Sequence, residues 1–387
     1  MHVLLIGSSF SAMPMLMSLK ERGFQVTTMG RHTGDPCHAY SDSAIYEDYS
    51  DQEALLKACR EHAFDFIVPT CNDYSYLAAS HVAGIMDYCG YDTAEVTQTL
   101  HVKSLFRKFC DDIGIPVPRT YGHFNAGEAF SIGDFAGRAL VKPVDSFSGR
   151  GVTLVDSVDQ AIAAAERAFE MSRARSAVVE EFVDGSLHSH TAFIAGGQVV
   201  WHDFVDEFCE VYPYQVDRSS YPSRLGHNQR EAVHKAMEKL IQTLKLEDGL
   251  LHTQFIASET DFWIIECMRR CPGDLYGHQF KYACGFDYED AYVSTFLGKA
   301  PSVPSSPSTS IDVERRIISV DANVPFFAAG LRAGGREVIY VPLKESGQLL
   351  EPAPFDKAGI VFFRGTKEVA RGDEETDPTF LPGYFAL

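Results

Sequence analysis

Short apolar runs alternate with helical spacing over the first hundred residues. A buried strand at the start leads through the turn Gly7-Ser8-Ser9 into a helix, and strand and helix patterns then repeat. This alternation predicts a parallel sheet, so residues 1–98 are expected to form a small doubly wound α/β domain. The opening turn lacks the full G-x-G-x-x-G fingerprint, which favours a packing role over dinucleotide binding. The predicted strands are His2–Ile6, Phe24–Met29 and Phe64–Pro69, and the predicted helices are Met13–Arg22 and Asp51–His62.

Beyond residue 100 the predicted strands are broken by glycines. The runs Ala139–Pro143 and Val152–Val155 read as strands, and they flank the segment D-S-F-S-G-R-G at residues 145–151. This glycine-rich hairpin is the most suggestive local feature of the chain. Further helices are expected at His101–Ile113, Ala161–Arg173 and residues 228–246, and further strands at Ala177–Val183, Thr191–Ile194, Val199–Trp201, Leu250–Ala257 and Phe262–Cys267.

A stretch rich in proline and serine at residues 300–310 reads as a linker. Short strands follow it, at residues 317–320, 338–342 and 359–363. We therefore expect three parts. They are an α/β domain at 1–98, a central region at 99–300 that divides into two subdomains near 180–184, and a small strand-rich lobe at 311–387.

Composition narrows the class of protein. Hydrophobic residues make up 45% of the chain and charged residues 22%, the balance of a folded protein. The net charge of -19 opposes long-range attraction to nucleic acid or anionic lipid, so neither partner is expected. The nine cysteines show no C-x-x-C spacing, and the N-terminus shows no signal pattern, so we expect a protein of the reducing cytoplasm that has no membrane segment.

Lys142 lies at the end of a predicted strand, directly before the glycine-rich hairpin. A cation, small hydroxyls and unhindered backbone amides within one loop can fold over a polyphosphate. A surface lysine beside an ordinary hairpin has the same local pattern, so this segment alone leaves both interpretations open.

The order of features along the whole chain resembles the ATP-grasp superfamily. Lys103, Lys142, the strand Glu180-Glu181-Phe182-Val183 and Glu266 occur in the sequence order of that family's nucleotide site. The family includes D-alanine:D-alanine ligase, biotin carboxylase and enzymes of purine synthesis. The resemblance implies an ATP-grasp fold of the α/β and α+β classes, with an N-terminal doubly wound domain and a C-terminal strand-rich lobe.

The same resemblance implies roles for particular residues. Lys103 and Lys142 would contact the phosphates of ATP, because phosphoryl transfer needs its negative charge neutralised. The segment Glu180 to Val183 would link the two subdomains and read the adenine edge, and Arg270 would hold an acyl-phosphate or a substrate carboxylate. The loop closing over the phosphates would include Ser146, Ser148, Gly149 and Gly151.

Three positions depart from the family pattern. Glu266 would bind Mg²⁺, but Gln254 stands where family members carry an acid, and Met268 stands where they carry asparagine. Asp274 is a candidate replacement ligand. The usual ribose-binding acid falls at Leu187, which leaves His188 or His190 as substitutes, or else as ordinary strand residues.

Three functions stay open at this point. The first is a ligase that activates a small carboxylate or amino acid as an acyl-phosphate for attack by an amine, releasing ADP. The second forms carboxyphosphate from bicarbonate, and the third is a nucleotide-binding regulator without turnover, motivated by Gln254 and Met268. A thiol nucleophile at Cys267 or Cys271 is disfavoured, because neither lies in a known local signature. A homodimer is compatible with the resemblance.

Overall fold

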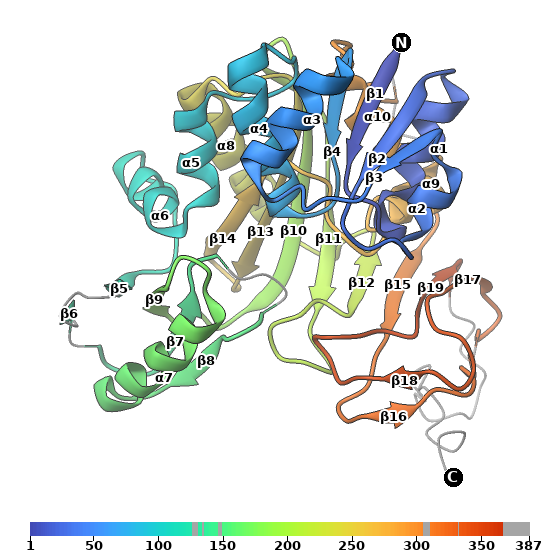
Figure 1. The fold of residues 1–387 in the computed structure, drawn as a ribbon. Coiled ribbons are helices and arrows are strands. Elements are labelled where there is room, and N and C mark those ends of the chain that lie inside the picture. Colours follow the sequence, from blue (N-terminus) through green and yellow to red (C-terminus); the bar gives the residue numbers. More distant parts are fainter. Residues whose placement is uncertain (126–130, 134, 146–148, 305–309, 332, 367–387) are drawn as a thin grey trace.

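The N-terminal part of the chain is a parallel α/β layer (Figure 1). The computed structural model describes residues 1–125, 131–133, 135–145, 149–304, 310–331 and 333–366. Four parallel strands lie in the order β3-β2-β1-β4. They are β1 (His2–Ile6), β2 (Gln25–Met29), β3 (Ser43–Ile45) and β4 (Phe66–Pro69). The helices of this region are η1 (Phe10–Ala12), α1 (Met13–Glu21), α2 (Pro36–Tyr40), α3 (Gln52–His62) and α4 (Asp73–Met86).

Local signals in the sequence explain where these helices begin. The side chain of Asp51 accepts hydrogen bonds from the amides of Glu53 and Ala54, and Asn72 caps α4 in the same way through Ser75. The apolar residues of β1 are fully buried between the helices. The parallel α/β domain is thus confirmed. The strand β3 was not predicted, since it has only three residues and none of them is buried.

The predicted helix at His101–Ile113 corresponds to the second of two successive helices, and the first of them was not predicted. Thr93 caps α5 (Ala94–His101), and α6 (Lys103–Asp112) follows it. Val102 between them has an extended backbone, which interrupts the helical hydrogen bonds. The break places Lys103 at the first turn of α6.

A five-stranded antiparallel sheet forms a separate lobe (Figure 1). Its strand order is β6-β5-β9-β7-β8. One face is covered by α7 (Val158–Met171), whose four alanines at 161, 164, 165 and 168 are fully buried and allow a close approach to the strands. The strands are β5 (Thr120–Asn125), β6 (Ser131–Ile132), β7 (Ala139–Pro143), β8 (Thr153–Val155) and β9 (Ser176–Glu181).

The second sheet has eight strands in the order β14-β13-β10-β11-β12-β15-β19-β17. It contains β10 (Ser186–Ala195), β11 (Gln198–Phe208), β12 (Arg218–Tyr221), β13 (Gly249–Ala257), β14 (Phe262–Met268), β15 (Val313–Ile318), β17 (Glu337–Pro342) and β19 (Gly359–Arg364). One face packs against α8 (His227–Leu244), and β16 (Val324–Pro325) pairs with β18 (Leu349–Leu350) nearby.

The C-terminal strands belong to this same sheet. Arg315 on β15 lies opposite Ser219 on β12, so hydrogen bonding continues across the stretch that reads as a linker. The segment at residues 300–310 therefore does not separate two sheets, because strands from both sides of it belong to the same eight-stranded sheet. Two further helices, α9 (His278–Cys284) and α10 (Tyr288–Phe296), pack between the eight-stranded sheet and the N-terminal domain. None of the described helices is both long and apolar enough to cross a membrane.

Candidate active site

One face of the eight-stranded sheet carries a row of side chains from four strands. Leu187 lies opposite Glu207, Glu207 opposite Ser219, and Ser219 opposite Arg315. Residues that face each other across antiparallel strands point to the same side of the sheet. Glu207 and Arg315 are each less than 5% exposed, so a buried acid and a buried base share this row.

A second row runs beside the first on the same face. Ser189 is two residues beyond Leu187 on β10, and it lies opposite Gln254, which in turn lies opposite Glu266. The Nε2 atom of Gln254 donates a hydrogen bond to Oε2 of Glu207 at 2.7 Å. The structure therefore brings Gln254 and Glu266 together as predicted and adds Glu207 to them.

The pKa of the Glu207 carboxyl group lies well above its ordinary value. Burial raises its pKa, and repulsion from Glu266 raises it further, whereas Arg315 and the hydrogen bond from Gln254 lower it. The net result is a pKa of about 7. Buried acids with displaced pKa values cluster at functional sites, and sequence analysis missed this one. The only sign of Glu207 in the sequence is an acidic residue within the strand-like run V-D-E-F at residues 205–208.

Arg315 is the second residue that sequence analysis missed. Its guanidinium donates to Oγ of Ser219 at 2.8 Å and to the backbone carbonyl of Asp274 at 3.0 Å. The carboxylate of Asp274 pairs with Lys357. Asp274, the candidate replacement ligand, is thus already engaged by a lysine, and its backbone carbonyl orients Arg315.

Met268 lies on the same face as Glu266, two residues further along β14. Its side chain is 5% exposed and lies opposite His252. Burial, with Arg270 and Arg315 nearby, lowers the pKa of His252 to about 3. His252 is therefore neutral beside two arginines at this end of the face, and the carboxylates gather at the other end.

A buried ion cluster organises the predicted phosphate site. Lys142 donates to Oε2 of Glu180 at 2.8 Å, and Nε of Arg107 lies 3.0 Å from Oε1 of the same carboxylate. Burial alone would raise the pKa of Glu180, but Lys142 and Arg107 lower it to about 2. Two cations share one carboxylate, so the cluster keeps a net positive charge for an anionic ligand.

Lys103 and the glycine-rich loop lie close to Lys142. The Nζ atom of Lys103 donates to the backbone carbonyl of Val144 at 3.2 Å, two residues beyond Lys142. Gly149 has a positive φ of 67°, and an added Cβ would overlap Tyr214. The loop therefore lies against residues of the larger lobe, and Tyr212 donates to the carbonyl of Gly149 at 3.2 Å. Ser146 and Ser148 lie outside the described residues, and the other loop residue of the prediction, Gly151, packs against Pro143 and Met171.

The predicted linker follows Glu180 directly. The carboxylate of Glu181 accepts from the Arg119 amide at 3.2 Å, and the Phe182 amide donates to the carbonyl of Arg138. The guanidinium of Arg138 stacks over the Phe182 ring at 4.2 Å, and Val183 is 8% exposed. These contacts hold the linker where β9 passes into β10, between the two sheets.

Arg270 makes a bidentate pair with Asp73. Its Nε and Nη2 atoms donate to the two carboxylate oxygens at 2.8 Å each. Burial would lower the pKa of Arg270, but Asp73 outweighs it and raises the pKa. The arginine fork is thus occupied by the first turn of α4. Arg269 donates through Nε to Oδ2 of Asp92 at 2.7 Å and through its Nη atoms to the carbonyls of Leu250 and Glu247, so its role is structural.

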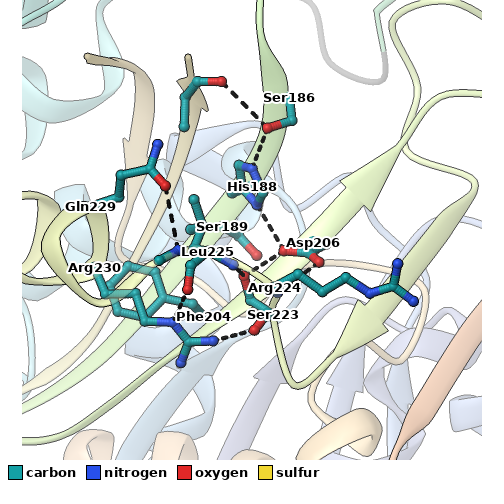
Figure 2. A network of polar contacts seen from close by, with 12 residues as sticks. Ser186, His188, Ser189, Phe204, Asp206, Ser223, Arg224, Leu225, Gln229 and Arg230 are labelled. Atoms are coloured by element: carbon teal, nitrogen blue, oxygen red, sulfur yellow. Dashed lines mark hydrogen bonds and ion pairs between the residues drawn. The ribbon is translucent and has the colours of Figure 1, made fainter. Parts of the chain in front are cut away.

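His188 lies on the opposite face of the sheet from Glu207 and Glu266. Its Nδ1 contacts Asp206 at 2.9 Å and its Nε2 contacts Ser186 at 2.6 Å (Figure 2). Asp206 also accepts from Ser223 and from the amide of Arg224. The structure does not bring His188 together with the two rows, and both of its ring nitrogens have partners within the sheet.

Comparison with known proteins fits this architecture. No protein-family model matches the chain. It is 26% identical over 243 residues to a formate-dependent phosphoribosylglycinamide formyltransferase of Corynebacterium jeikeium, a match that covers 57% of this chain and 55% of the relative. The chain thus spans about half the length of the curated relatives it matches. A shorter stretch of 93 residues, 23% of this chain and 10% of the relative, is 41% identical to cyanophycin synthetase of Synechocystis.

Solved structures show the fold over almost the whole chain. The L-amino acid ligase of Bacillus licheniformis superposes with a TM-score of 0.76 and 16% identity over 94% of this chain and 93% of that one. Phosphoribosylglycinamide synthetase of Anaerococcus prevotii gives 0.73 and 14% over 95% and 94%. The biotin carboxylase domain of a Hydrogenobacter thermophilus 2-oxoglutarate carboxylase gives 0.74 and 14% over 94% and 86%. The chain therefore has the ATP-grasp fold.

Proposed function

We propose that this protein is an ATP-dependent ligase that activates a small carboxylate as an acyl-phosphate and joins it to an amine, releasing ADP. The observation that carries the proposal is that the two sheets joined by the linker each carry a cluster of buried charged side chains. The Lys142 cluster is positive, and the two rows of the large sheet carry Glu207, Glu266 and Arg315. Relatives whose names include a formate-dependent formyltransferase and an amino acid ligase support the same chemistry.

Lys142 and Lys103 would bind the phosphates of ATP. Because Glu180 is shared between Lys142 and Arg107, Lys142 is held in place without losing all of its charge. A positioned cation at a transferring phosphoryl group stabilises the charge that spreads over its oxygens. The loop at Gly149 would then cover the phosphates and exclude water.

The adenine would lie at the linker. The Phe182 amide is already committed to the carbonyl of Arg138, so we assign recognition of the adenine edge to Val183, the next residue. Glu181 is anchored by the amide of Arg119, which fixes the direction of this backbone.

Magnesium fits the residues of the second row. Glu207 and Glu266 are close enough to repel one another, and Gln254 between them offers a carbonyl oxygen. A divalent cation would relieve this repulsion, and oxygen donors are those that Mg²⁺ prefers. Glu207 would thus supply the second carboxylate that Gln254 and Met268 fail to provide. The bound ion would neutralise phosphate charge.

Arg315 is the residue we assign to the substrate carboxylate. Arg270 is fully engaged by Asp73, whereas the guanidinium of Arg315 is held by a hydroxyl and a carbonyl, both neutral. Because neither of these contacts neutralises the guanidinium, its positive charge can pair with an anionic substrate. Arg270 stays a candidate for that role only if its pair with Asp73 opens.

The amine would enter through a cavity of about 830 Å³ beside the turn after β1. Five acidic side chains and three lysines line it, so its net charge favours a cationic amine. Asp35 on its wall accepts from Ser8 at 2.6 Å. Lys357 also lines the cavity and pairs with Asp274, whose carbonyl holds Arg315. Two contacts, Lys357 with Asp274 and Asp274 with Arg315, therefore link the wall of the cavity to the proposed carboxylate site.

The test is an ADP-release screen over pairs of small carboxylates and amines, with amino acids on both sides. Pair-dependent release of ADP and phosphate should be lost in Lys142→Ala. The matched control is Lys108→Ala on α6, an exposed lysine paired only to Asp112 four residues away, which should keep full activity. Release of AMP and pyrophosphate would exclude this mechanism.

Two other outcomes would favour the alternative functions. ADP release with bicarbonate and no amine would identify carboxyphosphate formation. If no pair of substrates caused ADP release while ATP raised the melting temperature of the protein, the result would identify a nucleotide-binding regulator. All nine cysteines are free thiols, which supports a reducing cytoplasm as the location, and a homodimer stays a proposal for a sizing experiment.

A further inference from the structure

Three histidines meet on the back of the eight-stranded sheet, away from the active-site face. His190 lies on β10, His202 on β11 and His234 on α8, which covers this side. One nitrogen from each ring can be chosen such that all three atoms lie within 4.8 Å of one another. Two strands of one hairpin and a helix further along the chain thus bring their imidazoles to one point.

One of the distances between these nitrogens equals that between two ligands of a metal ion. Nε2 of His190 and Nδ1 of His234 lie 3.4 Å apart. Two nitrogens bound to one tetrahedral zinc ion at about 2.0–2.1 Å lie about 3.3–3.4 Å apart. The rings of His202 and His234 stack with centroids 3.7 Å apart at an angle of 10°, so His202 would have to turn out of this stack to bind the same ion.

The contrast with His188 shows what His190 lacks. Both ring nitrogens of His188 have polar partners, Ser186 and Asp206 (Figure 2). His190, two residues further along the strand, is fully buried, and its Nε2 faces another imidazole nitrogen, Nδ1 of His234, where Nε2 of His188 faces a hydroxyl. A metal ion held by both nitrogens would satisfy their lone pairs together.

We propose that His190, His202 and His234 bind a divalent transition-metal ion of borderline softness, with zinc as the representative. Imidazole ligands select such ions over Mg²⁺ and Ca²⁺, which prefer oxygen. His202 is solvent-exposed and gives the ion access. Oε1 of Glu238 lies 3.7 Å from Nε2 of His234, the ring nitrogen that would not bind the ion, so this carboxylate can orient the ring while a water molecule completes a tetrahedral set.

The ion would tie α8 to the hairpin of β10 and β11. This site is on the opposite side of the sheet from Glu207 and Glu266, so the inference does not depend on the proposed ligase activity. Its effect would be structural, because binding to the folded state alone raises stability.

The test is zinc binding by full-length protein stripped with a chelator, measured by calorimetry in the presence of excess Mg²⁺. Wild type should bind one zinc ion tightly, and zinc should raise its melting temperature. His202→Ala and His234→Ala should each weaken binding by more than about 100-fold, since losing even an outer partner of a ligand typically costs about 10- to 100-fold. The matched control is His227→Ala, an exposed histidine at the start of the same helix, which should bind as wild type does.

Cobalt substitution gives a second readout that separates histidine from cysteine ligands. Tetrahedral Co²⁺ held by nitrogen should give visible d–d bands without a thiolate charge-transfer band, and His202→Ala should abolish them. Because His202 is exposed, its replacement is expected to leave the fold intact. The proposal is overturned if zinc fails to bind, if it binds both variants as tightly as wild type, or if thiolate bands show that cysteines hold it.

Discussion

At the scale of single residues, the main determinant of the candidate active site is how its buried charges are compensated. Glu180 is fully buried between two cations, so its ionised form is stabilised in the folded protein. Glu207 is buried beside a second acid, so its ionised form is destabilised. The two carboxyl groups therefore respond to pH and to substitution in opposite ways.

Replacing Glu180 by glutamine should destabilise the protein strongly. The change leaves Arg107 and Lys142 without their shared anion, and breaking a buried pair costs about 3–5 kcal/mol. The wild-type pKa is lowered to about 2, so the stabilisation is complete above pH 4.5 and is lost as pH falls towards 2. Urea unfolding at pH 7 and pH 3 should show a difference between wild type and Glu180→Gln that shrinks at the lower pH. Glu166→Gln on the exposed face of α7 serves as the control.

Replacing Glu207 by glutamine should instead relieve a penalty. Its folded pKa of about 7 lies above the ordinary value, so the folded state holds a proton more tightly and wild type loses stability as pH rises from about 4.5 to 7. The loss is up to about 3 kcal/mol, and Glu207→Gln should lack it. The measurement is the free energy of unfolding from pH 5 to 8 without metal, with exposed Glu259→Gln as control. Parallel pH curves for Glu207→Gln and wild type would refute the assignment.

At the scale of elements, strand register decides which side chains meet. Sequence analysis identified Glu266 and Gln254, because both lie on neighbouring strands of one hairpin and the family order marks them. Glu207 and Arg315 escaped it, since they join the site only through the pairing of β11, β12 and β15, which local patterns do not encode. His188 was assigned to the nucleotide from its position in the sequence, and the alternation of β10 turns it to the other face.

The glycine-rich loop gives a prediction at this scale. Gly149→Ala would place a Cβ against Tyr214 and should raise the KM for ATP about tenfold or more, because a misplaced group near the reacting atoms costs up to about 100-fold. Gly137→Ala is the matched control, since Gly137 also has a positive φ but no atom within 4 Å of the added carbon. Steady-state kinetics should show the KM change for Gly149→Ala alone. Equal KM changes in both variants would mean that backbone strain is responsible.

At the scale of the whole molecule, the sequence predicted the fold better than it predicted the division of the chain into domains. The alternating pattern indicated the N-terminal α/β domain, and the ordered lysines and acids indicated the ATP-grasp fold. The proline and serine residues at 300–310 indicated a domain boundary, because this composition is typical of linkers. Composition does not show that strands on both sides of the segment pair in one sheet. Val313, Ile360 and Phe362 from the C-terminal strands are buried in the same core as Phe280.

Truncation tests whether the C-terminal lobe is independent. A chain ending at residue 310 would lose β15, β17 and β19, expose the edge of β12 and remove Arg315 from the site. We expect it to aggregate or to be digested rapidly by protease, because an uncovered edge strand with an apolar face is unstable. A truncated chain with a cooperative thermal transition and undiminished ATP binding would establish the segment as a separate domain.

The pair between Arg270 and Asp73 has a consequence for the timing of turnover. It joins the end of β14 to the start of α4, and the nearby contact of Arg269 with Asp92 reinforces the joint. With the N-terminal domain and the large sheet fastened together in this way, any opening for nucleotide exchange would fall to the smaller lobe, which would rotate about residues 181–184. The residence time of ADP, and with it the maximum catalytic rate, would then depend on the backbone of this linker and not on the carboxylates that would hold the metal ion.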